Sequence, residues 1–476
     1  MNDDEFIARH RDEWLRRLNK FRNLQNFGLV VAALKACIEC LILSKRHIES
    51  FLGEKYVMKS ALHLMLLGFA LEVSVIASPL RAAQPVGKEF RKVETVVTHS
   101  QPSFLLANDQ VRLGVTEIGG HMAPVKFFAD SKTPIEPYYI SPWQDEPKSE
   151  MPAAVLNSLR GDFFCMPFGG NADAVNGEKH PPHGEIAGSK WNAISVEDVG
   201  EATTLTLEFE TQVRKGKVTK QLSLVKGQNV VYSKHTIEGF AGRVPLGHHA
   251  TLAMPEKEGS VHLASSKIRF GMTCPGVFSD PKNGEYQALL PGIQWTDLTR
   301  VPVLAKDAPD ADLSRLPGRY GYADLVQLVN DPAGDQPAWM TATFPDAGYV
   351  WFSLKDPKVL ASTVFWMEYH GRHGHPWNGR NNCLGLEDVT SHFADGLAPS
   401  IAENVLSKQG VPTAVELKSS EPTVVNYIQG VARIPADFNR VASIEFGTRE
   451  LTLVSPDGKR IIVPVNHQFT KTGKLN

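Results

Sequence analysis

Hydrophobic and polar residues alternate with a period of two along most of the chain after about residue 95. Val111, Leu113 and Val115 alternate with polar or small residues, and a glycine pair at 119–120 then provides a turn. The same pattern recurs further along, in residues 205–209, 220–239, 349–354, 362–369 and 414–417. Because successive side chains of a strand point to opposite faces, the pattern predicts half-buried β-strands.

No long amphipathic helix is predicted between these strands, so parallel βαβ units are not expected. The pattern therefore predicts an all-β fold, a large antiparallel β-sandwich over residues 95–420. Two long stretches without alternation, 167–186 and 291–320, are expected to be functional loops.

Residues 421–476 continue in the same style and are predicted to form a C-terminal β segment. The runs 444–454 and 460–465 flank the turn sequence Ser455-Pro-Asp-Gly458, which predicts a hairpin. The sequence is compatible with an extension of the sandwich and with a small appended module.

The beginning of the chain has a different composition. Residues 1–57 carry apolar residues at helical spacing, which predicts a helical N-terminal extension. Residues 58–83 have a short positive start, an apolar middle and small residues at the end, which is the layout of a secretory signal peptide. Either translation starts at Met58 and residues 1–57 are not part of the native product, or the first 80 residues are a helical or membrane-anchoring segment.

These two alternatives predict different locations. A start at Met58 predicts a periplasmic or secreted protein that begins near Gln84, which N-terminal sequencing of protein from its native host would test. The other alternative predicts anchoring through residues 27–83, although Lys35 and Glu39 make the first apolar run a poor membrane span. Neither predicts stable membrane insertion of the main domain.

Composition narrows the range of partners. With 42% hydrophobic and 21% charged residues, the 476-residue chain can build a sizeable core. A net charge of −2 and the lack of a long basic run after residue 60 give no indication of a nucleic-acid partner. Cys37 and Cys40 form a CxxC within an apolar helical pattern that has no second Cys or His pair, so no metal site is expected.

Three residues in the first half of the chain can contribute to a binding site. Arg160 offers a rigid fork of donors that suits vicinal hydroxyls or a carboxylate. His183 precedes Gly184, where a ligand or backbone can approach closely. Trp191 can supply an apolar platform for a sugar ring. Each residue also has an ordinary interpretation, as a salt-bridged arginine, a surface histidine and a core tryptophan.

His248 and His249 open a probable strand. Because adjacent strand residues point to opposite faces, only one of them can line a given pocket. The residues alone leave both possibilities open.

Glu387 stands in the apolar context Leu384-Gly-Leu-Glu, directly after the segment 365–380, which is rich in aromatic residues, His, Arg and Gly. A charged group is rarely placed on an apolar strand end unless it is paired or used. Pairing with Arg372 or Arg380 is the structural alternative to a catalytic role.

Taken in order, these stretches resemble the aldose 1-epimerase (galactose mutarotase-like) family. The likeness consists of an early strand pair at 111–125, an Arg-bearing loop, an HG…W stretch, a strand that begins with His, and a late Leu-Glu. It spans roughly residues 95–420 and rests on order and spacing. The resemblance implies the galactose mutarotase-like supersandwich and an isomerase that interconverts sugar anomers by acid/base ring opening.

The resemblance also implies roles for individual residues. Glu387 is expected to be the base that takes the proton from the C1 hydroxyl, and His249, rather than His248, the acid that protonates the ring oxygen. No metal or organic cofactor is required, and a monosaccharide or oligosaccharide is the expected ligand. The expected substrate-binding residues, taken from the resemblance and from the loop before Glu387, are Arg160, His183, Trp366 and Asn378.

The chain departs from the best-known mutarotases at two motifs. The HG pair is followed by Glu185-Ile-Ala rather than by a second glycine and an aromatic-rich run. The second histidine stands in His-His-Ala rather than beside Asn and an aromatic residue. These departures leave the sugar open.

Two other functions are compatible with the residues. A polysaccharide hydrolase or lyase of the same architecture would use a second carboxylate, for which Asp162, Glu185 and Asp388 are candidates. A non-catalytic carbohydrate-binding protein would need no base and would keep its tryptophans, namely Trp191, Trp366 and Trp377.

Overall fold

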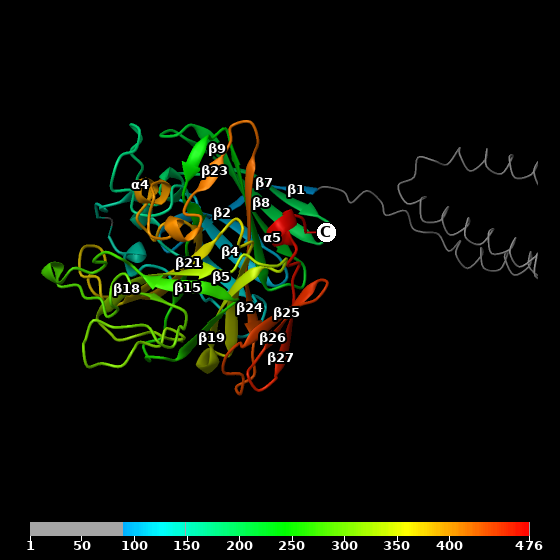
Figure 1. Cartoon of the computed structure of the whole chain (residues 1–476). Coiled ribbons are helices and arrows are strands. Elements are labelled where there is room, and N and C mark those ends of the chain that lie inside the picture. The colour runs from blue at the N-terminus through cyan, green and yellow to red at the C-terminus, as the bar shows by residue number, and fades with distance from the viewer. Residues whose placement is uncertain (1–88, 148, 476) are drawn as a thin grey trace, which may run out of the picture. The chain divides into compact units, whose positions relative to one another are not determined.

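The computed structural model describes residues 89–147 and 149–475, so the predictions for residues 1–57 and 58–83 lie outside the described residues. The described chain is built almost entirely from antiparallel strands (Figure 1), with two short α-helices, α4 (Leu397–Ile401) and α5 (Phe469–Thr472). The predicted all-β antiparallel sandwich is confirmed. Among the described helices, none is long and apolar enough to cross a bilayer.

One of the two large sheets has ten strands and forms one layer of the sandwich. Its central strand, β24, comes from the C-terminal part of the chain. From edge to edge the strands are β1 (Glu89–Arg91), β7 (Asn192–Val199), β8 (Ala202–Thr211), β9 (Gly216–Val225), β10 (Val230–Glu238), β24 (Thr423–Arg433), β20 (Tyr349–Lys355), β19 (Ala338–Phe344), β14 (Val261–Ser265) and β17 (Arg315–Leu316).

The second large sheet has eight strands and carries most of the candidate site residues. Strand β13 (Ala250–Ala253) pairs with β22, next to β12. The remaining strands, in order, are β16 (Gln294–Trp295), β15 (Ile268–Thr273), β18 (Tyr322–Asn330), β21 (Ser362–Tyr369), β22 (Asn382–Thr390), β12 (Leu246–His248) and β6 (Phe164–Cys165).

Three smaller sheets and six short 3₁₀ helices complete the described chain. The sheets contain β2 (Glu94–Thr98), β3 (Gln101–Ala107), β4 (Val111–Thr116) and β5 (Met122–Phe127); β25 (Ser443–Phe446), β26 (Glu450–Val454) and β27 (Arg460–Pro464); and β11 (Gly242–Val244) with β23 (Val415–Leu417). The 3₁₀ helices are η1 (Pro142–Asp145), η2 (Ala154–Asn157), η3 (Glu185–Ala187), η4 (Pro281–Asn283), η5 (Pro345–Ala347) and η6 (Ser407–Gln409).

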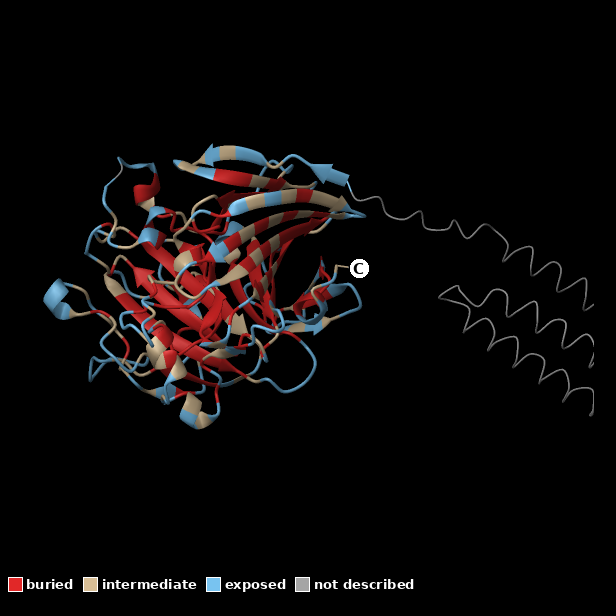
Figure 2. Ribbon diagram, turned by 90° about the horizontal axis from the view of Figure 1, so that it is seen from above, coloured by how far each residue is buried: buried red, intermediate tan, exposed pale blue. Residues whose placement is uncertain are grey.

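The two large sheets pack face to face, and their buried strands form the interior seen in Figure 2. Tyr427 on β24 stacks on His248 of β12, with ring centroids 4.1 Å apart. Phe164 on β6 stacks in the same way on His235 of β10, at 4.0 Å. The eight-stranded sheet therefore has one face against the ten-stranded sheet and a second, outer face under the long loops.

A buried ion pair joins the sheets. Lys355 Nζ on β20 lies 2.6 Å from Asp388 Oδ1 on β22, and both side chains are 1% exposed. Asp388 Oδ2 accepts hydrogen bonds of 2.8 Å from the hydroxyls of Ser353 and Tyr427. Because Asp388 points between the sheets, its neighbour Glu387 points to the outer face, as alternation requires.

The C-terminal segment is partly integrated into the sandwich. Since β24 lies in the middle of the ten-stranded sheet, the predicted boundary between residues 420 and 421 does not coincide with a structural boundary. The predicted hairpin exists as β26 and β27, but the run 444–454 is split by a turn in which the Gly447 N–H donates to the Glu450 carbonyl. These last strands and α5 pack on the ten-stranded sheet through an apolar cluster that includes Tyr232 and Phe469.

Candidate functional site

A small cavity opens on the outer face of the eight-stranded sheet, with a volume of about 130 Å³. Its floor is formed by neighbouring strands, because Leu325 on β18 faces Trp366 on β21 and Val364 on β21 faces Glu387 on β22. The described residues that line the cavity are Val155, Leu156, Leu159, His183, His249, Phe278, Leu325, Trp366, Arg372, Trp377, Glu387 and Ala394.

Glu387 and His249 form a buried acid–imidazole pair in this cavity. His249 Nε2 lies 3.1 Å from Glu387 Oε1, and the two side chains are 6% and 2% exposed. Gly385 precedes Glu387 by two residues and therefore lies on the same face of β22. It leaves room for the carboxyl group of Glu387, since a Cβ at position 385 would lie 2.5 Å from Glu387 Oε1. The apolar strand around Glu387 therefore holds its carboxyl group against the histidine.

Burial sets the protonation state of this pair. Desolvation raises the pKa of Glu387 well above its usual range and lowers the pKa of His249 well below its usual range, and the nearby His183 lowers it further. Both shifts favour a neutral carboxylic acid that donates to a neutral imidazole Nε2. In that tautomer His249 Nδ1–H donates to Thr251 Oγ1, which lies 3.1 Å away.

Aromatic packing fixes the imidazole of His249. Phe163 stacks on it with ring centroids 4.5 Å apart and an interplanar angle of 17°, and His121 stacks nearly parallel to Phe163 at 4.0 Å. The ring of His183 meets His249 edge-on at 5.0 Å. Burial lowers the pKa of His183 to about 4, so at neutral pH both histidines are uncharged hydrogen-bonding groups.

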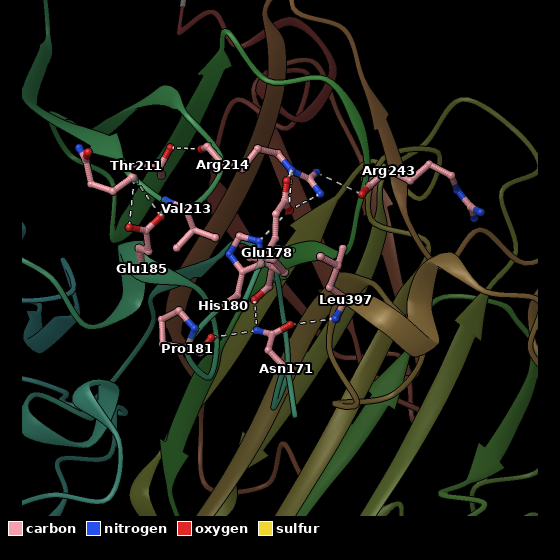
Figure 3. A network of polar contacts seen from close by, with 12 residues as sticks. Asn171, Glu178, His180, Pro181, Glu185, Thr211, Val213, Arg214, Arg243 and Leu397 are labelled. Atoms are coloured by element: carbon pink, nitrogen blue, oxygen red, sulfur yellow. Dashed lines mark hydrogen bonds and ion pairs between the residues drawn. The ribbon is translucent and has the colours of Figure 1, made fainter. Parts of the chain in front are cut away.

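The loop that carries His183 is tied to the turn between β8 and β9 (Figure 3). Glu178 accepts hydrogen bonds from Arg214 Nε and Nη2, the shortest being 2.8 Å, and lies 3.1 Å from His180 Nε2. The carboxylate of Glu185 accepts from the backbone N–H groups of Gln212 and Val213 at 2.9–3.1 Å. The two carboxylates therefore fix the loop on both sides of His183.

A buried asparagine, Asn171, also holds the loop that carries His183. The side-chain amide of Asn171 donates to the carbonyls of Pro167, Gly169 and Pro181, while its oxygen accepts from Leu397 N–H at 2.8 Å. These contacts hold His183 in the left-handed backbone region, at φ 60°, where residues other than glycine are uncommon. Such a constrained residue beside a cavity suits a functional side chain.

Arg372 brings a positive charge to the cavity wall. Its guanidinium lies over the rings of Phe278 and Trp377, with distances of 5.0 and 5.6 Å to the ring centroids. Its side chain has no hydrogen bond to any residue that the structure describes, and the nearest carboxylate oxygen, Glu368 Oε2, is 3.8 Å from its Nε. The terminal nitrogens are thus available to a ligand.

Glu368 supports the loop that presents Arg372. Its Oε1 accepts from the N–H groups of Gly371 and Arg372 at 3.0 and 2.9 Å, and desolvation raises its pKa to about 7. An unfolded chain loses this proton near pH 4.5, whereas the folded protein keeps it to about pH 7. The contribution of Glu368 to stability is therefore present below pH 4.5 and is lost as the pH rises through 7.

We predict that Glu368→Gln flattens the pH dependence of stability, because glutamine keeps an acceptor for the two N–H groups and cannot ionise. The loss of unfolding free energy between pH 4.5 and 7.5 should shrink by on the order of 3 kcal/mol. Urea unfolding at a series of pH values measures it, with the exposed Glu201→Gln as the matched control. An unchanged pH dependence in Glu368→Gln would contradict the prediction.

Neither a protein-family model nor a curated protein matches the sequence. Solved structures, however, share the fold. One from Klebsiella pneumoniae subsp. pneumoniae, provisionally named an aldose 1-epimerase, has a TM-score of 0.50 at 11% identity and covers 74% of this chain and 88% of its own. A galactose mutarotase-like protein from Clostridium acetobutylicum has a TM-score of 0.47 at 11% identity, covering 72% and 99%. This is the galactose mutarotase-like fold. At such identities the similarity establishes the fold and leaves the chemistry to the side chains in the cavity.

Within the galactose mutarotase-like fold, the cavity contains four of the six predicted site residues. Glu387, His249, His183 and Trp366 line it together. His248 instead faces the space between the sheets, where its Nδ1 lies 2.9 Å from Asp162 Oδ2.

Arg160 and Asn378 lie away from the cavity. Arg160 is 1% exposed. Its guanidinium donates to the carbonyls of Thr98 and His99 and to the amide oxygen of Gln144, so these three residues occupy donors of both terminal nitrogens. Asn378 lies exposed in the loop after β21 and does not line the cavity. Neither residue therefore belongs to the described lining of the cavity around Glu387 and His249.

Trp191, proposed as a platform for a sugar, is buried in the core. Its indole N–H donates to the Ile186 carbonyl at 2.9 Å, and its ring packs against Phe209. From the sequence, Arg372 was expected only as a possible partner of Glu387. Both arginines suggested for that pairing have other carboxylates, since Arg372 lies near Glu368 and Arg380 pairs with Glu146.

The cavity contains one carboxyl group among its described lining residues, that of Glu387. The three candidates for a second one are used elsewhere. Asp162 contacts His248, Glu185 holds the His183 loop, and Asp388 pairs with Lys355. The described residues also contain no group of three or more His, Cys, Asp or Glu side chains placed to hold a metal ion.

Proposed function

We propose that the protein is an aldose 1-epimerase-like isomerase that interconverts the α and β anomers of a monosaccharide by opening and closing the ring. The observation that carries the proposal is the buried contact of 3.1 Å between His249 Nε2 and Glu387 Oε1 in a cavity of about 130 Å³. Anomer exchange needs one proton taken and one proton given at neighbouring oxygens, which such a pair can perform.

The working form of the pair is reached by one proton shift along this contact. The shift converts the neutral pair into a Glu387 carboxylate and a His249 imidazolium. Sugar hydroxyls and the charge of Arg372 supply polar surroundings that favour the charged form when a ligand occupies the cavity. Glu387 is then the base and His249 the acid.

In the reaction, Glu387 takes the proton of the C1 hydroxyl while His249 protonates the ring oxygen. The bond between C1 and the ring oxygen breaks, C1 becomes an aldehyde carbon, and rotation about C1–C2 presents its other face. The reverse proton transfers close the ring as the other anomer. Each positioned proton transfer contributes about 10²–10⁴-fold to such a reaction.

Substrate binding is assigned to the remaining polar and aromatic groups of the cavity. His183 offers a neutral imidazole to a hydroxyl, and Arg372 provides the donors that were expected from Arg160. Trp366 meets His249 edge-on at 5.7 Å and supplies an apolar face for the sugar ring.

Polarimetry or NMR of freshly dissolved aldoses, with and without protein, tests the proposal. We expect acceleration of anomer exchange for at least one sugar of a small panel. Ligand-observed NMR on the same panel identifies the alternative, since a non-catalytic carbohydrate-binding protein would bind a sugar and leave its rate of mutarotation unchanged.

The pH dependence of kcat/KM should show that Glu387 and His249 together carry one proton over a wide range of pH. Because burial lowers the pKa of His249 and raises that of Glu387, the doubly protonated pair forms only at low pH and the fully deprotonated pair only at high pH. We therefore predict an acid limb well below the pKa of about 6.5 of free histidine and an alkaline limb well above the value of about 4.3 of free glutamate. A single acid limb near pH 6.5 would contradict this.

A further inference from the structure

We propose that the sugar bound in this cavity is poor in hydroxyl groups, and that 6-deoxyhexoses are the class that fits. This inference rests on the proposed function in taking the cavity around Glu387 and His249 as the sugar site. It adds the chemistry of the substrate, which follows from the composition and size of the cavity walls.

The cavity has few partners for hydroxyl groups. Four of its twelve described lining residues have charged or imidazole side chains, namely His183, His249, Arg372 and Glu387, and Trp366 and Trp377 each add an indole N–H donor. In the reaction, His249 and Glu387 serve the ring oxygen and the C1 hydroxyl. Arg372, the two indoles and His183 then remain for the hydroxyls at C2, C3, C4 and C6 of an ordinary hexose. Among these groups only the imidazole of His183 can accept a hydrogen bond from a hydroxyl.

Another part of the wall is aliphatic. Leu156, Leu159 and Leu325 line the cavity, and none of them can donate or accept a hydrogen bond. A hydroxyl pressed against them loses its water without gaining a partner, which is unfavourable in a buried site. A methyl group in the same place makes no hydrogen bond to water, so its removal from water is favourable.

The aliphatic wall is fixed. The side chains of Leu156, Leu159 and Leu325 are 8%, 6% and 5% exposed and belong to one apolar cluster with Trp366. The cavity volume of about 130 Å³ is small beside the roughly 300–1,000 Å³ of ordinary ligand sites. Substituents of a bound ring that point toward these leucines meet a wall held in place by packing, so the wall selects among substituents.

The test uses sugar pairs that differ in one hydroxyl group: D-galactose with 6-deoxy-D-galactose, and D-glucose with 6-deoxy-D-glucose. Dissociation constants come from ligand-observed NMR and kcat/KM from the rate of anomer exchange. We expect the deoxy sugar of at least one pair to be favoured about 10- to 200-fold in both quantities, the range for a small change against an apolar pocket.

Substitution of the wall tests the cause of the preference. Leu325→Asn should reduce the preference for the deoxy sugar by at least about tenfold, since it gives the hydroxyl a partner. Leu156→Asn is the second variant if Leu325→Asn does not fold. The matched control is Ile462→Asn on β27, because Ile462 is 61% exposed and does not line the cavity. It should leave the preference unchanged.

The outcomes separate the two proposals. Tighter binding of the deoxy sugar without turnover would support the inference and overturn the isomerase. Turnover with equal or better use of the full hexoses would overturn the inference and support the isomerase. Absence of binding by all four sugars would overturn both.

Discussion

Replacing Glu387 by glutamine is expected to lower kcat for anomer exchange by at least about a hundredfold. Glutamine keeps the shape of the side chain and a hydrogen bond to His249, but it can neither accept nor return a proton. Thermal stability should stay close to that of the unchanged protein, because no arginine among the described residues pairs with Glu387 and its carboxyl group is buried at a cost.

The matched control is Asp324→Asn. Asp324 is a buried carboxyl group on β18 of the same sheet with a pKa raised to about 6, and it does not line the cavity. It accepts from the N–H groups of Ala288 and Leu289, so its replacement should alter stability and spare turnover. Equal rates for Glu387→Gln and the unchanged protein on every sugar that turns over would refute the acid/base mechanism.

The second large effect is expected at the next residue. Asp388→Asn should lower the unfolding free energy by about 3–5 kcal/mol, because it leaves the buried ammonium group of Lys355 without its counter-charge. Urea unfolding measures this effect. As the next residue on the same strand, Asp388 is predicted from the sequence alone to point away from Glu387 and to tolerate asparagine. The side chain does point away, but its four contacts, with Lys355, Ser353, Thr363 and Tyr427, argue against tolerance.

A double variant separates the charge from the packing. Lys355→Met combined with Asp388→Leu removes both charges, and replacing a buried pair by apolar residues is often neutral. The double variant should therefore be more stable than Asp388→Asn alone. If Asp388→Asn is as stable as the unchanged protein, the pair does not stabilise the fold in the way described.

Much of the fold is predictable because alternation directly reports strands that are buried on one face. The run 362–369 coincides with β21, and the run 220–239 contains most of β9 and all of β10, which a turn at 226–229 joins. Sheet membership is a different matter. The pairing of β24 with β10 and β20 joins segments distant in sequence, and no local pattern contains that information.

The site was predictable where residue type and strand alternation coincide. Glu387 lies in β22, where alternation fixes its direction. His249 lies between β12 and β13, and it was preferred to His248 because of the family resemblance. Both side chains reach the cavity. Arg160 could not be placed, since its partners are backbone carbonyls that no pattern identifies. Arg372 was misjudged because its position depends on the fold of the loop after β21, which Glu368 holds by backbone contacts.

The position of β24 has a consequence for how the protein is made. Strands β10 and β20 lie on either side of β24 and are synthesised before it. The edges that pair with β24 therefore stay open until residues 423–433 leave the ribosome. Unpaired strand edges favour association with other chains, and such non-local pairing is slow. The ten-stranded sheet can close only when the nascent chain is nearly complete. Ribosome-bound chains that end before residue 423 should therefore depend on chaperones to stay unaggregated.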